Sequence, residues 1–412
     1  MMVEFFQPRA EAEPESAYAW LRLLASVLLG SIGSVGMWSV VVALPAVQAE
    51  FASDRAGASM PYTLAMVGFG LGAVIFGRLV DKWGMILPAA LSVITLAIGF
   101  VISGFAPSLS IFALANFVIG FGSSATFAPI LGDISHWFTR RRGIAVAVCA
   151  AGNYVGGAIW PPVVQALIAH AGWRNNQIVI GIFCLLSMAP LLLVLRRKLA
   201  HGLETEAAQT LREARAASIP FSTNTLFALL CLAGVACCIA MAMPQVHIVA
   251  YCADLGYGTV NGANMLALML AFGIVSRIAS GFIADRIGGL ATLMIGSFLQ
   301  GVALFLYLLA DGLTPLYVIS ALFGLFQGGI VPMYAVVSRE FFPPEQASTR
   351  VSLVITASIG GMALGGWISG AIFDLTGSYW QAFANGLIWN LVNLSIVVFL
   401  FLRSKAGPVV AA

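Results

Sequence analysis

Arg277 is the charged residue whose position says most about the chemistry of this protein. It lies eight residues before Asp285 within an apolar stretch, which is about 12 Å along a helix. A buried arginine costs a membrane-spanning helix at least about 2.5 kcal/mol, so it is usually kept for a function. Because its planar fork can donate two hydrogen bonds to one carboxylate, we expect Arg277 to bind an acid. The alternative is a structural arginine that pairs with helix-end carbonyls or with Asp133.

His247 is the other titratable residue inside an apolar stretch. It follows Pro244 and Gln245 in the sequence. An imidazole in water titrates at about pH 6.5, which suits proton exchange. His247 is therefore the candidate for proton coupling, and it could also hydrogen-bond the substrate directly. The alternative is a histidine that neighbouring hydroxyls or carbonyls satisfy.

Uncharged polar residues within the apolar stretches could line a cavity. We select Asn116, Tyr154, Gln327 and Tyr334 as further substrate contacts, although polar side chains also simply join helices. The histidines and acids lie too far apart in these stretches to suggest a catalytic group, and no phosphate-binding Gly-Lys-Ser/Thr motif is present. The six cysteines lack a paired metal-ligand spacing. We therefore expect no enzyme activity, no metal and no cofactor.

The elements that must position these residues are membrane-spanning helices. Hydrophobic residues make up 60% of the chain and charged residues only 9%, which is too little charge to cover a soluble protein of this size. Apolar runs of about 20 residues indicate membrane spans. Twelve such runs are predicted, at 21–47, 59–80, 86–106, 109–137, 143–169, 175–195, 223–251, 259–284, 289–310, 314–338, 347–373 and 379–402. The predicted fold class is an all-α membrane protein with twelve transmembrane helices.

One short signature occurs twice, 204 residues apart. GRLVDKWG at 77–84 returns as GFIADRIG at 281–288, and the same offset carries Phe138 onto Phe342. Parallel repeats of this kind are typical of secondary transporters. We expect two pseudo-symmetric six-helix bundles, residues 1–195 and 223–412, joined by a hydrophilic linker at 196–222.

The basic residues predict how the chain crosses the membrane. If both termini are cytoplasmic, the opposite side keeps only Arg55 and Arg174, as the positive-inside rule requires. We expect a multi-pass protein of the cell (inner or plasma) membrane with both termini inside. Each basic cluster sits in a short loop beside a span, so nucleic acid is not an expected partner. The expected partners are the lipid bilayer and a small molecule, and the expected state is a monomer.

The repeated signature resembles the loop motif of the major facilitator superfamily. Its glycines allow a tight turn, its aspartate suits a facing helix N-terminus, and its basic residue holds the loop at the cytoplasmic side. The resemblance implies the major facilitator fold and a latch that closes one face. The expected gating residues are Gly77, Asp81, Lys82, Gly84, Asp285 and Arg286, together with Arg141 and Arg142 before the fifth span.

A second segment is similar to the lead into span five of monocarboxylate transporters. It reads HWFTRRRGIAVAVCAAG at 136–152, and a weaker match, ESAYAW at 15–20, lacks the family's glycine. In that family an arginine of span eight binds the substrate, and Arg277 matches its place. The family's better-known animal members also carry an acid where this chain has Gly273, and a lysine near Ala43. Their proton-relay scheme therefore does not transfer.

These observations predict a secondary active transporter of small monocarboxylates such as lactate or pyruvate. It would work by alternating access with proton symport, and His247 or the substrate itself would carry the proton. One alternative is an oxalate–formate-type anion exchanger, although a dicarboxylate favours two deep cations. A drug or neutral-solute exporter, in which Arg277 is structural, is a second. A transporter-like sensor is a third, but it would need a large cytoplasmic extension, and none is evident.

Overall fold

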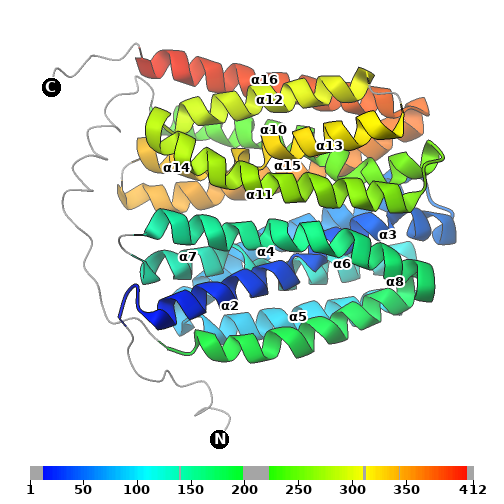
Figure 1. Ribbon diagram of the computed structural model, residues 1–412, viewed down its shortest axis with the longest axis horizontal. Helices are drawn as coiled ribbons and strands as arrows, with labels where there is room; N and C mark the ends of the chain where they lie inside the picture. The colour runs from blue at the N-terminus through cyan, green and yellow to red at the C-terminus, as the bar shows by residue number, and fades with distance from the viewer. Residues whose placement is uncertain (1–12, 139–140, 198–221, 310–311, 343, 406–412) are drawn as a thin grey trace, which may run out of the picture.

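The computed structural model describes residues 13–138, 141–197, 222–309, 312–342 and 344–405, and within these ranges every regular element is a helix (Figure 1). Eleven helical stretches there are long and apolar enough to cross a membrane. The longest, 144–195, contains Gly172 at φ 77° and ψ 160°, which is not helical geometry. It therefore crosses twice, and the described residues make twelve crossings.

The first six crossings lie together in the lower half of Figure 1. They comprise α2 (Ala17–Gly33), α3 (Val35–Phe51), α4 (Arg55–Trp83), α5 (Ile86–Gly104), α6 (Leu109–Ser123), α7 (Ala128–Trp137) and α8 (Arg142–Leu192), with short 3-10 turns at Ser124–Thr126 and Leu193–Leu195. The predicted linker is mostly outside the described residues, which omit 198–221.

The last six crossings occupy the upper half of Figure 1. They comprise α10 (Thr223–Asp254), α11 (Thr259–Ile287), α12 (Gly289–Leu309), α13 (Leu313–Gln327), α14 (Ile330–Phe341), α15 (Pro344–Thr376) and α16 (Tyr379–Lys405). The offset of 204 residues carries the bounds of α4 onto those of α11, and the bounds of α6 onto those of α13. The sequence repeat is thus a repeat of structure.

Glycines set the same close helix contact in each half. A Cβ at Gly120 would lie 2.6 Å from the carbonyl carbon of Ala65, and a Cβ at Gly324 would lie 2.7 Å from that of Met269. Both residues of the second pair are 204 positions after those of the first. Only a residue without a side chain lets the backbones approach this closely.

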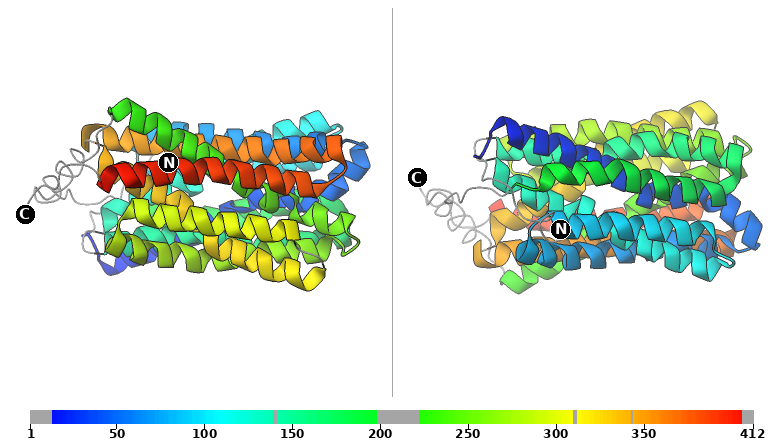
Figure 2. Two further views of the ribbon diagram at one scale, coloured as in Figure 1. Left: turned by 90° about the horizontal axis from the view of Figure 1, so that it is seen from above. Right: turned by 90° about the horizontal axis from the view of Figure 1, so that it is seen from below.

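The helices run along the long axis of the molecule in all three views (Figure 2). We call the end at which α8 stops and α10 starts the linker end, and the end at which α10 stops and α11 starts the opposite end. The two halves meet where α4 packs against α15 and where α8 packs against α11. Residues on these four helices can therefore contact across the boundary.

Breaks interrupt several crossings within the bundle. The first crossing breaks at Ser34, between α2 and α3, and the tenth breaks at Gly328–Gly329, between α13 and α14. The fourth breaks at the corresponding place, where Phe127 has φ −123° and ψ −86°. Broken helices free backbone carbonyls and amides inside the membrane, where they must find partners. One of these carbonyls reaches the predicted site.

Candidate substrate site and gate between the two halves

Arg277 contacts both halves of the molecule. Its Nε donates to the carbonyl oxygen of Gly328 at 3.2 Å, and its Nη1 donates to the carbonyl oxygen of Ala150 on α8 at 3.0 Å. Its side chain is buried, with an exposed fraction of 9%, and it forms no ion pair with any acid among the described residues. A buried cation whose described partners are all neutral has the charge and the donors to take an anion, so binding by Arg277 stays a prediction.

The break after α13 explains the first of these contacts. A Cβ at Gly328 would lie 2.5 Å from the carbonyl oxygen of Gly273, so only glycine allows this approach to α11. The next amide, of Gly329, donates to the Ser276 hydroxyl at 3.0 Å. Because Pro332, four residues further on, has no N–H to donate, the Gly328 carbonyl can accept from Arg277.

Tyr154 and Gln327 complete the group around Arg277. The guanidinium carbon lies 3.9 Å from the centre of the Tyr154 ring, a cation–π contact. The Tyr154 hydroxyl donates to Oε1 of Gln327 at 3.4 Å, from α8 to α13. Nε2 of Gln327 is buried and has no partner among the described residues. Three of the predicted substrate contacts therefore lie together at the boundary between the halves.

Two other predicted contacts bond within their own half. Asn116 donates to the carbonyl of Phe112 on the same helix at 2.8 Å, and its buried Oδ1 has no partner among the described residues. The Tyr334 hydroxyl donates to Oδ1 of Asn393 at 2.6 Å inside the second half. Their contact with substrate stays a prediction.

Asp133 does not pair with Arg277. It accepts from Arg22, with 2.7 Å between Nε and Oδ2 and 2.9 Å between Nη2 and Oδ1. Arg277 does donate to one carbonyl at a helix break, that of Gly328, as the structural alternative expected, so its partners alone leave both roles open. The absence of an acid around it, among the described residues, favours the binding role.

His247 lies nearer the opposite end than Arg277. It precedes the end of α10 at Asp254 by seven residues, whereas Arg277 follows the start of α11 at Thr259 by 18. At the usual helical rise this places His247 about 16 Å closer to that end. Its Nε2 lies 2.8 Å from the carbonyl oxygen of Gly366 on α15, and its buried Nδ1 has no partner among the described residues.

A cluster at the opposite end joins the halves, and the sequence patterns did not single it out. Nη2 of Arg55, on α4, lies 2.6 Å from Oδ2 of Asp254 on α10. Asp374 of α15 accepts from the backbone N–H groups of Arg55 at 2.8 Å and Ala56 at 2.7 Å. The guanidinium also lies 5.0 Å from the centre of the Phe373 ring. We call Arg55, Asp254 and Asp374 the opposite-end latch.

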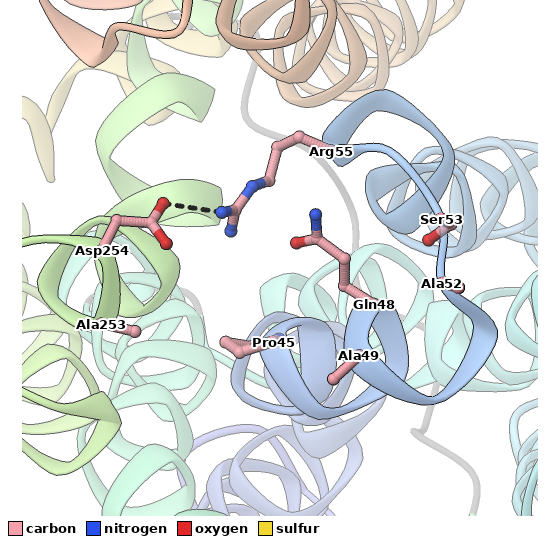
Figure 3. A pocket seen from close by; sticks show the side chains of 8 residues that line it. All are labelled: Pro45, Gln48, Ala49, Ala52, Ser53, Arg55, Ala253 and Asp254. Atoms are coloured by element: carbon pink, nitrogen blue, oxygen red, sulfur yellow. Dashed lines mark hydrogen bonds and ion pairs between the residues drawn. The ribbon is translucent and has the colours of Figure 1, made fainter.

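The only advance signal for this latch was the scarcity of basic residues on that side, where Arg55 and Arg174 stand alone. Charged residues at helix ends are ordinary, so composition did not distinguish Asp254 or Asp374. A pocket of about 360 Å³ lies beside the latch. Figure 3 shows Arg55 and Asp254 facing one another there, with the Gln48 amide beside the Arg55 guanidinium. Its lining residues are Pro45, Gln48, Ala49, Ala52, Ser53, Arg55, Ala253 and Asp254.

The predicted gating residues lie at the linker end. Space is open around Gly77 and Gly281, where an added Cβ would meet no atom within 4 Å. Gly84 and Gly288 end α4 and α11 with φ of 76° and 87°, the left-handed region that favours glycine. Exposed Asp285 makes no hydrogen bond or ion pair with any described residue.

The remaining gating candidates have local contacts or are not described. Arg286 is exposed, and Lys82 lies 5.6 Å from the Trp83 ring centre. Arg141 donates its backbone N–H to Glu15 at 2.9 Å, and its guanidinium lies 5.9 Å from the Trp20 ring centre. The side chains of Asp81 and Arg142 are outside the described residues. A latch at this end stays a prediction.

Known proteins resemble the chain over nearly its whole length. The family model of the Major Facilitator Superfamily matches residues 26–315. Monocarboxylate transporter 13 of Bos taurus is 26% identical over 406 residues, which are 95% of this chain and 91% of that protein. An uncharacterized MFS-type transporter of Bacillus subtilis, YcxA, is 24% identical over 84% of this chain and 86% of its own length.

A solved structure supports the same fold. The bacterial homologue of the human lysosomal transporter Spinster, in an inward-facing and occupied conformation, superposes with a TM-score of 0.68 at 16% identity, over 95% of this chain and 96% of that one. A two-half helical bundle with a polar group at its boundary is the architecture of a multi-pass membrane transporter. The chain belongs to the Major Facilitator Superfamily, which confirms the family and the all-helical fold predicted from the repeated signature.

Proposed function

We propose that this protein is a secondary active transporter of small monocarboxylates and that Arg277 binds the carboxylate. The observation that carries this proposal is the environment of Arg277, a buried cation at the boundary of the halves with no acidic partner among the described residues. An anion that neutralises it would be bound between the parts that must move for alternating access.

The number of deep cations favours a substrate with one carboxylate. Among the described side chains, Arg277 is the cation that lies at the boundary near the middle of the crossings, and Arg55 at the opposite end is already paired with Asp254. An oxalate–formate-type exchanger would need a second cation to match a dicarboxylate. The similarity to proteins named monocarboxylate transporters supports the same choice. An exporter of drugs or neutral solutes remains the alternative in which Arg277 only holds α8 and α13.

The latch at the opposite end supports alternating access. Arg55, Asp254 and Asp374 join the two halves at that end. If the basic loops place the linker end in the cytoplasm, this form is closed to the outside. Asp81 and Asp285 would then make their contacts in the form that opens outward.

Proton symport is the coupling that we propose. A monocarboxylate that neutralises Arg277 and travels with one proton moves no net charge. His247 is a buried titratable group on α10, bonded to α15 two turns below the opposite-end latch. It would pick up the proton there, or the substrate would enter protonated.

Uptake by reconstituted vesicles tests the role of Arg277. We expect Arg277→Ala to abolish uptake of labelled lactate and pyruvate while the protein still inserts. Arg277→Lys should also be poor, because a point charge cannot reproduce the bidentate fork. Arg174→Ala is the matched control, since that arginine bonds Glu50 near the surface. Wild-type uptake by the Arg277→Ala variant would disprove the role.

A further inference from the structure

We propose that Gly273 and Tyr154 act as a positioning pair for Arg277, so that the arginine stays fixed for an anion without an acidic counter-ion. The inference rests on the proposed role of Arg277 in binding. Tyr154, which the sequence predicted as a substrate contact, would act through Arg277 and not as a ligand of the substrate. It would hold the guanidinium at a fixed place and angle.

The Tyr154 ring occupies space that only glycine leaves open. A Cβ at Gly273 would lie 2.5 Å from Cδ1 of Tyr154, closer still to Cε1, and 3.6 Å from Cζ. Non-bonded carbons do not approach to 2.5 Å, and an aromatic ring cannot bend away as a flexible chain end can. Any other residue at position 273 must therefore move the ring or separate α11 from α8.

The ring is held on three sides. One edge faces Gly273, the hydroxyl bonds Gln327 of α13, and the guanidinium of Arg277 lies 3.9 Å from the ring centre. Gly273 and Arg277 are four residues apart, on one face of α11. The edge of the Tyr154 ring therefore packs against Gly273, and its face contacts the arginine one turn further along α11.

One segment of α8 supplies two of the neutral contacts of Arg277 from the first half, and the ring centre of Phe127, 6.0 Å from the guanidinium, is a third. The Ala150 carbonyl accepts from Nη1, and Tyr154, one turn later on the same helix, provides the π face. Nη2 makes no hydrogen bond with any described residue. Because the ring carries no net charge, an incoming carboxylate at Nη2 does not have to displace an internal carboxylate.

Transport kinetics separate positioning from general damage. Tyr154→Phe keeps the ring and removes only the hydroxyl bond to Gln327, so it should raise the KM for lactate less than a variant without the ring does. Tyr154→Leu removes the π face and should raise the KM about tenfold with a smaller effect on Vmax. Gly273→Ala should raise the KM similarly by displacing the ring. The double variant Gly273→Ala/Tyr154→Leu should be no worse than Tyr154→Leu, because both changes break one contact.

A charge at position 273 gives a second test with a matched control. Asn and Asp have nearly equal volume, so Gly273→Asn reproduces the steric effect of Gly273→Asp without its charge. We expect the aspartate variant to bind lactate at pH 7 at least about tenfold more weakly than the asparagine variant, because its carboxylate would pair with Arg277. Equal KM values for the two variants would contradict the idea that a neutral surrounding leaves Arg277 free for an anion.

A measurement without substrate distinguishes failure of this inference from failure of the proposed function. Thermal unfolding of wild type, Tyr154→Leu, Arg277→Met and the double variant should show coupling between the two sites, since the ring and the guanidinium are in contact. Additive effects would overturn the positioning pair, whatever is transported. Clear coupling, together with no lactate or pyruvate uptake by the wild type, would keep the pair and reject the proposed substrate class.

Discussion

Arg55 and Asp254 join the two halves of the protein through an ion pair at the opposite end, with 2.6 Å between Nη2 and Oδ2. Arg55 also begins α4, and its backbone N–H donates to Asp374 of α15 at 2.8 Å. An aspartate at a helix N-terminus accepts from unpaired backbone donors and is favoured by the helix dipole. This is the kind of contact that the repeated signature predicted for Asp81 at the linker end. The two ends would therefore be closed by the same chemistry in alternate states.

Asp374→Asn should shift the protein toward forms that are open at the opposite end. Removing the charge weakens a helix-terminus contact by about 1 kcal/mol, which changes the ratio of two states about fivefold. The measurement is the labelling rate of a cysteine placed at Ala253, in the pocket beside the latch, with a membrane-impermeant maleimide. The parent without that cysteine corrects for labelling of the native thiols.

Glu50→Gln is the control for the latch prediction. It breaks the ion pair of Glu50 with Arg174, which lies at the same end but within the first half. We expect the cysteine at position 253 to be labelled at the same rate with and without Glu50→Gln. Equal labelling of the cysteine at position 253 with and without Asp374→Asn would show that Asp374 does not hold this end closed.

Arg22→Ala should destabilise the first half. Arg22 is only 2% exposed, and its partner Asp133 is 15% exposed. Removing one member of a buried ion pair leaves the other charge without compensation, which costs about 3 to 5 kcal/mol. The measurement is thermal unfolding in detergent. Arg174→Ala breaks a pair that is 34% and 42% exposed, which contributes less than about 1 kcal/mol, together with hydrogen bonds to the carbonyls of Gly104 and Ala106, so it should cost less than Arg22→Ala. Similar losses for both variants would contradict this prediction.

The repeated glycine contacts predict a second stability difference. A Cβ at Gly324 would meet the backbone of Met269, and a helix backbone cannot move aside without moving the helix. A Cβ at Gly360 would meet nothing within 4 Å. We expect Gly324→Ala to lower the unfolding temperature by separating α13 from α11. Gly360→Ala should leave it unchanged or raise it slightly, because alanine favours the helix by about 1 kcal/mol. Thermal unfolding of the two variants side by side checks both outcomes.

The sequence predicted the crossings and their repeat well because both depend on strong local signals. Apolar runs are long in this chain, and the offset of 204 that relates the two signatures also relates Ala65–Gly120 to Met269–Gly324. The breaks at Ser34 and Gly328 were not predicted. Glycine and serine are common within membrane spans, so residue type alone does not mark which of them ends a helical segment.

The candidate site was predicted one residue at a time, without its contacts. Arg277, Tyr154 and Gln327 were each selected for polarity within a span, but their meeting depends on how α8 and α11 cross. The better-known animal monocarboxylate transporters carry an acid at the position of Gly273, but that difference did not indicate which side chain fills the space in this chain. That the space is filled by Tyr154 could not be read from the spacing, because the two residues are 119 positions apart.

Uptake should be driven by an inward proton gradient and should not respond to membrane potential. A monocarboxylate with one proton carries no net charge, so a potential of 100 mV would contribute none of the about 2.3 kcal/mol that it gives each translocated charge. Vesicles with an imposed pH step, or with a potassium–valinomycin potential, separate the two driving forces. Accumulation that follows potential alone would exclude electroneutral proton symport and favour anion exchange or sodium coupling.

His247 variants then identify the proton carrier. His247→Ala removes the imidazole that bonds Gly366, and His247→Gln keeps a donor for that carbonyl but cannot titrate. If His247 carries the proton, both variants should lose accumulation driven by the gradient while they still exchange one acid for another. Failure of His247→Ala alone would mean that the hydrogen bond to α15 matters and the titration does not. Normal accumulation by both variants would assign the proton to the substrate, because His247 is the titratable imidazole buried within the described crossings.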